Sequence, residues 1–184
     1  MRIVLSVLFL LLAFGGRAQR ATVYEVQHST LTFHSSAPKE LITAATTELK
    51  GLLDIGKRLF AFKVVVGSFK GFNNSLQQEH FRENYMETHR YPDAQYTGKI
   101  IEDVDLGQPG VYQIRTKGKL LIHGVAQERI IRSQVTVKEG QVLIRSEFSV
   151  LLRDHDIKIP RVVYEKLAAE INVTMDAVLL PKKS

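Results

Sequence analysis

The chain has 184 residues, a formal net charge of +6 at pH 7 and no cysteine. The lack of cysteine excludes disulfides, thiol catalysis and thiolate–metal sites. The positive charges are spread along the chain without forming a run, so we expect no nucleic-acid partner.

Residues 1–18 have the pattern of a secretory signal peptide. Arg2 precedes an apolar run over residues 3–14, and Gly16-Arg17-Ala18 places small residues where a signal peptidase reads them. The run is shorter than the roughly 20 apolar residues that span a membrane, which makes an uncleaved anchor the weaker alternative. We therefore predict cleavage after Ala18 and one mature domain, 19–184. This domain would be periplasmic or extracellular, with no transmembrane anchor and no lipidated cysteine.

The mature region alternates between apolar and polar residues with a period of two. This alternation is typical of strands with one buried face. Turn signals separate the segments, as at Gln108-Pro109-Gly110 and Lys138-Glu139-Gly140. Many short strands with regular turns predict an all-β fold, either an antiparallel barrel or a sandwich. The alternating segments are 22–27, 30–35, 58–69, 110–124, 129–152 and 170–180.

Two short helices are also predicted. Ser75 followed three residues later by Gln78 fits a capping box, and we expect a helix over Leu76–Glu87. Its end lies before Tyr91-Pro92, because a residue that precedes proline avoids the helical region. The second helix is expected over residues 160–170, where Pro160 suits a first helical turn.

Residue patterns for catalysis or metal binding are weak. His80 and His89 are nine residues apart, so they do not share a helix face at a spacing of four. The chain has no HExxH or GxSxG motif, and paired carboxylates such as Asp154 and Asp156 fall in turns. We therefore expect no catalytic residues, no metal and no cofactor, and a protein that is not an enzyme.

Residues 80–100, HFRENYMETHRYPDAQYTGKI, resemble the signature of the YceI-like family of polyisoprenoid-binding, lipocalin-like proteins. A second similar segment is GKLLIHGVAQE at 118–128, and weaker matches are DHDIKIP at 154–160 and the segments at both ends of the mature chain. The family usually has two phenylalanines where this chain has Tyr85 and Met86. It also has threonine, a basic residue and proline where this chain has residues 126–128. The residues that match the first signature are His80, Tyr85, Met86, Tyr91, Pro92, Ala94 and Tyr96.

The resemblance implies an eight-stranded antiparallel barrel that holds a long isoprenoid chain, from a polyprenyl phosphate or a quinone tail, in its lumen. An eight-stranded barrel has room for side chains or one slender ligand. Each buried methylene contributes about 0.8 kcal/mol, so a partly complementary apolar tunnel suffices for binding. The partner would be an isoprenoid or another long-chain lipid, and a homodimer is possible.

Two groups of residues are candidates for ligand binding. On the segment 58–69, the even-numbered residues share one face and the odd-numbered ones the other, and the pattern leaves open which face points inward. Candidates for the tunnel wall are Phe60, Phe62, Val64, Leu120 and Ile122. Candidates for a cap over the barrel are Phe69, Phe72, Phe81, Tyr85, Met86 and Tyr91.

Each candidate group has a structural alternative. The alternative for the wall residues is an ordinary filled core, and the alternative for the cap residues is a helix that plugs the barrel. A filled barrel would act through its surface, as a non-catalytic interaction or stress-response module. Arg82, Arg90 and Lys99 are candidates for a pyrophosphate contact at the mouth, with a solvated basic rim as the alternative.

Overall fold

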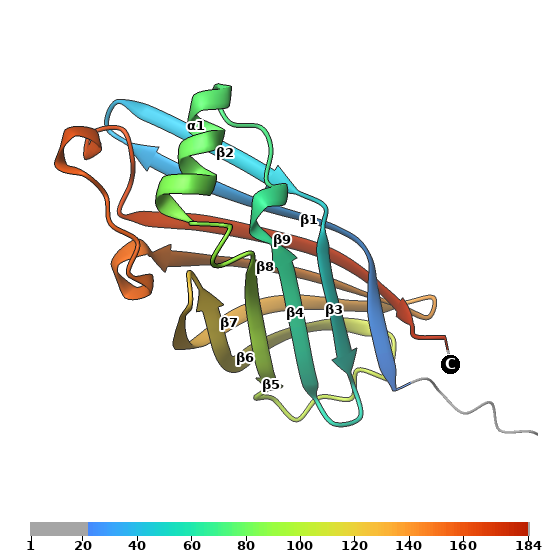
Figure 1. The fold of residues 1–184 in the computed structure, drawn as a ribbon. Coiled ribbons are helices and arrows are strands. Elements are labelled where there is room, and N and C mark those ends of the chain that lie inside the picture. The colour runs from blue at the N-terminus through green and yellow to red at the C-terminus, as the bar shows by residue number, and fades with distance from the viewer. Residues whose placement is uncertain (1–21, 184) are drawn as a thin grey trace, which may run out of the picture.

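The computed structural model describes residues 22–183, so the predicted signal peptide lies outside the described residues. Strands make up most of this region, and one short α-helix lies at one end of the sheet (Figure 1). The strands are β1 (Val23–Ala37), β2 (Glu40–Thr46), β3 (Leu49–Asp54), β4 (Leu59–Val65), β5 (Asp93–Ile100), β6 (Gly110–Ile122), β7 (Val125–Lys138), β8 (Gln141–Leu151) and β9 (Glu170–Pro181).

The sheet closes into a barrel through the pairing of β1 with β9. All neighbouring strands are antiparallel, and β3 to β9 follow one another in chain order. β2 pairs with residues 31–37 of β1 and β3 pairs with residues 23–25, both on the edge of β1 that faces away from β9. β2 and β3 therefore act as one interrupted strand. The predicted eight-stranded antiparallel barrel is confirmed.

The predicted alternation appears directly in the burial of β4. Phe60, Phe62 and Val64 are buried, whereas Leu59 and Lys63 are exposed. The even-numbered face therefore points into the barrel. β7 and β8 also form the predicted hairpin, in which Glu139 and Gly140 adopt positive φ values of 51° and 74°.

The first predicted helix is present but starts and ends differently. It comprises α1 (Ser75–His80) and a π-helical turn over Phe81–Tyr85. Its N-cap is Asn74, whose Oδ1 accepts a hydrogen bond from the backbone N–H of Gln77 at 2.9 Å. The expected capping box at Ser75 was therefore placed one residue too late. The helix stops at Met86, before Tyr91-Pro92, because Glu87 turns the chain with a φ of 41°.

The prediction of a second helix over residues 160–170 is wrong. Only a single 3₁₀ turn forms, over Arg161–Val163. Val162 is 90 % exposed, so this segment has no broad apolar face to bury, and such burial supplies most of a short helix's stability. Its backbone also bonds to groups outside the segment, since the N–H of Ala168 donates to Ser35 Oγ on β1 and the carbonyl of Glu165 accepts from the N–H of Lys39.

The two ends of the barrel differ. At the end near the β7–β8 hairpin the interior is filled, and the residues there that are at most 1 % exposed include Leu106, Val142 and Leu179. At the other end lie α1, the β1–β2 hairpin and the loop that follows β8 (Figure 1). None of the helices in residues 22–183 combines the length and the hydropathy that a membrane crossing requires.

Candidate functional site: an apolar cavity below the helix

A cavity of about 230 Å³ lies inside the barrel. Its wall comes from the inward faces of β1 and β3–β9, and the segment Phe81–Met86 and the loop after β8 border it at the helix end. This volume is far larger than the roughly 10–15 Å³ that admits one water molecule. The lining is almost entirely apolar, so the cavity suits a hydrophobic ligand.

Most residues predicted from sequence line this cavity. The structure brings together Phe60, Phe62, Val64, Phe69, Phe81, Tyr85, Met86, Leu120 and Ile122 on its wall.

The other two predicted residues, Phe72 and Tyr91, do not line the cavity. The segment Phe81–Met86 forms the roof of the cavity. Phe72 packs against this roof without reaching the cavity, with its ring centroid 5.0 Å from that of Phe81. Tyr91 packs edge-on against the ring of His123, with centroids 4.5 Å apart.

Sequence reasoning missed Phe33 on β1, which anchors the roof. Its ring lies 5.3 Å from Phe69, 5.4 Å from Phe81 and 5.9 Å from Phe72, measured between centroids. Such aromatic pairs contribute about 0.5–1.5 kcal/mol each beyond the area that they bury. The signal that could have found it is the alternation of the first strand, which places Phe33 on the same face as Leu31, another lining residue.

The helix places adaptable side chains over the cavity. The π-helical turn widens the helix between Phe81 and Tyr85, and both residues together with Met86 reach the cavity. Burial raises the pKa of the Tyr85 hydroxyl above its ordinary value. Met86 brings a flexible side chain that adapts to irregular apolar partners.

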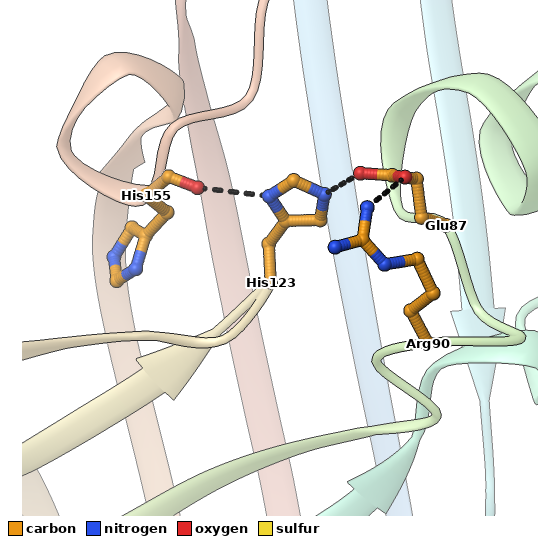
Figure 2. A network of polar contacts seen from close by, with 4 residues as sticks. All are labelled: Glu87, Arg90, His123 and His155. Carbon is orange, nitrogen blue, oxygen red and sulfur yellow. Dashed lines mark hydrogen bonds and ion pairs between the residues drawn. The ribbon is translucent and has the colours of Figure 1, made fainter.

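A polar network ties the end of this helix to two other segments at the same end of the barrel (Figure 2). His123 Nε2 lies 2.8 Å from Glu87 Oε2, and His123 Nδ1 lies 3.1 Å from the carbonyl oxygen of His155. Arg90 donates from Nη1 to Glu87 Oε1 at 2.9 Å. The hydrogen bond from His123, and then that from Arg90, hold the pKa of the Glu87 carboxyl below its ordinary value.

His123 faces an acceptor with each ring nitrogen. The ring of His123 therefore joins the Glu87 carboxylate to the carbonyl of His155. Next to it, Gly124 has a φ of 75°, and a Cβ at this position would lie 2.5 Å from the Tyr91 ring. The network therefore needs glycine here, which lets Tyr91 pack beneath His123.

The basic candidates for a head-group contact are not gathered at one place. Arg90 is paired with Glu87, and Lys99 lies at the opposite end of β5, beside Leu59 and Lys117 in the ladder. Arg82 lies on the helix, and its buried Nε has no hydrogen-bond partner within residues 22–183. The mouth therefore does not carry the predicted group of three cations.

Metal ligands are not clustered in the described part of the chain. Residues 22–183 contain no group of three or more histidine, aspartate and glutamate side chains placed to hold a metal ion.

A model of the YceI-like domain family matches residues 23–179, which cover the barrel from its first strand to its last. The chain belongs to the YceI-like family. No curated protein matches the sequence. The YceI-like barrel is shared with solved structures at 14–15 % identity, and this likeness shows the fold.

Three of these structures illustrate how far the likeness extends. A polyisoprenoid binding domain from Saccharophagus degradans, implicated in plant cell wall breakdown, superposes with a TM-score of 0.73 at 14 % identity, covering 88 % of this chain and 99 % of that one. Burkholderia cenocepacia BcnA gives 0.68 at 14 % identity, with coverages of 82 % and 95 %. A Campylobacter jejuni YceI protein gives 0.56 at 15 % identity, with coverages of 72 % and 78 %.

Proposed function

We propose that this YceI-like protein carries or sequesters a long isoprenoid-type lipid, such as a polyprenyl phosphate or a molecule with a quinone tail, inside its barrel. The observation that carries the proposal is the apolar cavity of about 230 Å³, bordered by the adaptable segment Phe81–Met86. The similarity to the polyisoprenoid binding domain from Saccharophagus degradans supports the same ligand class.

Burial alone accounts for binding of this kind. Each methylene removed from water contributes about 0.8 kcal/mol. Only part of the sum becomes affinity, because ordering a flexible chain costs free energy. The proposed action is non-covalent and non-catalytic. Residues 1–18 would direct export as a signal peptide, and the cleaved protein would act in the periplasm or outside the cell.

Native mass spectrometry of protein purified from its own cell envelope tests the proposal. We expect a mass above that of the bare chain starting at Gln19, together with a lipid in the organic extract that accounts for the difference. The same spectrum shows whether the barrel forms a homodimer. The bare mass with nothing extracted would favour the alternative, a barrel that acts through its surface alone.

A substitution on the roof connects the bound lipid to this cavity. Tyr85→Asp places a charge against the lining, so we expect the folded variant to retain much less lipid than the wild type. The matched control is Tyr164→Asp, because Tyr164 is 58 % exposed and does not line the cavity. Equal lipid content in wild type and both variants would place the ligand elsewhere.

A further inference from the structure

Two serine hydroxyls meet on the inner wall of the cavity. Ser133 on β7 and Ser146 on β8 face each other in the ladder, and both line the cavity. They are 8 % and 4 % exposed, and their Oγ atoms lie 2.7 Å apart in a hydrogen bond.

One of the two hydroxyl hydrogens of this pair has no acceptor within residues 22–183. Each serine carries one O–H donor, and a single hydrogen suffices for the bond between the two oxygens. Within residues 22–183 neither hydroxyl has a second partner. The neighbouring polar pair differs, because Thr116 Oγ1 donates to the carbonyl of Ile131 and Tyr96 donates to Thr116. A buried donor without an acceptor is costly, so the serine pair is suited to an acceptor supplied by a ligand.

The serine pair lies close to the blind end of the cavity. Toward the β7–β8 hairpin, the next inward pair is Val135 and Ile144, which still line the cavity. The pair after that, Val137 and Val142, is buried in the filled core and does not line it. A ligand that reaches the serines therefore does so with its inner end.

The charges near this end favour a neutral ligand group. Among residues 22–183, Lys63 is the only lysine or arginine in the lining, and its Nζ lies 2.8 Å from Asp93 with the side chain 52 % exposed. Arg129 on β7 donates to the carbonyl of Ser149 and is not part of the lining. A phosphate at the blind end would be buried without a counter-ion, which costs far more than burying a neutral oxygen.

We propose that Ser133 and Ser146 form a subsite for a neutral oxygen at the inner end of the ligand. The lipid then enters with its polar end first, and the class it belongs to is an apolar chain ending in an alcohol, a ketone or a quinone carbonyl. This inference rests on the proposed carrier function and narrows its ligand class.

The test compares three probes with one C20 isoprenoid chain: geranylgeraniol, the hydrocarbon that lacks the hydroxyl, and geranylgeranyl monophosphate. Affinities are measured by displacement of an apolar fluorophore from wild type, Ser133→Ala, Ser146→Ala, the double variant and the surface control Ser36→Ala. For the serine subsite, ratios between proteins are compared for each probe, so the aqueous solubility of the probe cancels. For the ligand class, the alcohol and the phosphate are compared directly on each protein.

The expected result is non-additive. Either single variant keeps one hydroxyl with a free hydrogen, so it still binds the alcohol nearly as well as the wild type. The double variant loses about fivefold for the alcohol, the equivalent of one neutral hydrogen bond, and nothing for the hydrocarbon. Replacing both partners with alanine also leaves no unpaired group, so the double variant folds. The phosphate binds more weakly than the alcohol to every protein.

Other outcomes separate the two proposals. If the double variant binds the alcohol as well as the wild type does, the serine subsite is overturned while the carrier function stands. Phosphate binding as tight as alcohol binding overturns the neutral ligand class. If the wild type binds none of the three probes, the carrier function itself fails.

Discussion

Single residues outside the cavity wall determine how the helix is held at the barrel's end. The Glu87 carboxylate accepts from His123 and Arg90, and these contacts lower its pKa. A carboxyl whose pKa is lower in the folded state stabilises the fold above its unfolded pKa, and the stabilisation is lost as the pH falls through the folded pKa. The network should therefore stabilise the protein at neutral pH and lose this effect below about pH 4.5, the ordinary value for glutamate.

Urea unfolding of Glu87→Gln at pH 7 and at pH 3 tests this dependence. We expect a lower urea midpoint than that of the wild type at pH 7 and a smaller difference at pH 3, because the contribution of the carboxylate is lost as the pH falls through its lowered folded pKa. Glu83→Gln is the matched control, because Glu83 is exposed on the π-helical turn that precedes Glu87 and makes no ion pair within the described residues. A difference between wild type and Glu87→Gln that is equal at both pH values would contradict the prediction.

The same residues show where sequence reasoning stops. The lining was largely predictable, because alternation within one strand determines which side chains share a face, as for Phe60, Phe62 and Val64. The contact of His123 with Glu87 joins residues 36 positions apart, and no local pattern encodes it. The pairing of Ser133 with Ser146 required the register of β7 and β8, which the sequence indicates only at the hairpin turn.

At the scale of elements, strands were more predictable than helices. A strand shows its buried face with a period of two over a few residues, whereas α1 has only six residues and none of them is buried. Its position therefore depends on its cap and on the aromatic cluster around Phe33, not on a long amphipathic pattern. The segment after Pro160 had a good first residue for a helix but no broad apolar face to bury, and its hydrogen bond to Ser35 on β1 helps determine its path.

The cap of α1 gives a prediction at this scale. Asn74→Ala removes the side-chain acceptor for the Gln77 N–H, so the free energy of unfolding should fall by roughly 1 kcal/mol. Ser75→Ala is the comparison that separates the observed cap from the one expected from sequence. It should change the free energy of unfolding by less than about 0.5 kcal/mol, since Ser75 is exposed and lies inside the helix. Chemical denaturation at pH 7 measures both, and a larger loss for Ser75→Ala would assign the cap to Ser75 instead.

For the whole molecule, closing the barrel requires two strands to approach at a glycine pair. Gly98 on β5 lies directly opposite Gly118 on β6. A Cβ on Gly118 would lie 2.3 Å from the carbonyl oxygen of Thr97, and a Cβ on Gly98 would lie 2.2 Å from that of Lys117. Both obstacles are backbone atoms, which side-chain rotation does not remove. Glycines inside strands mark such close approaches and bends of barrels.

Gly118→Ala should therefore destabilise the entire barrel by about 1–3 kcal/mol, the range for overpacking a well-packed interior. Gly67→Ala is the matched control, because no heavy atom lies within 4 Å of the added methyl group. Urea unfolding at pH 7 measures both variants, and equal midpoints would show that the ladder widens at no cost.

The double variant Gly98→Ala/Gly118→Ala tests whether a single separation of β5 from β6 explains the loss of stability at both sites. Once the first methyl group has forced β5 and β6 apart, the second costs less, so the combined loss should be smaller than the sum of the two single losses.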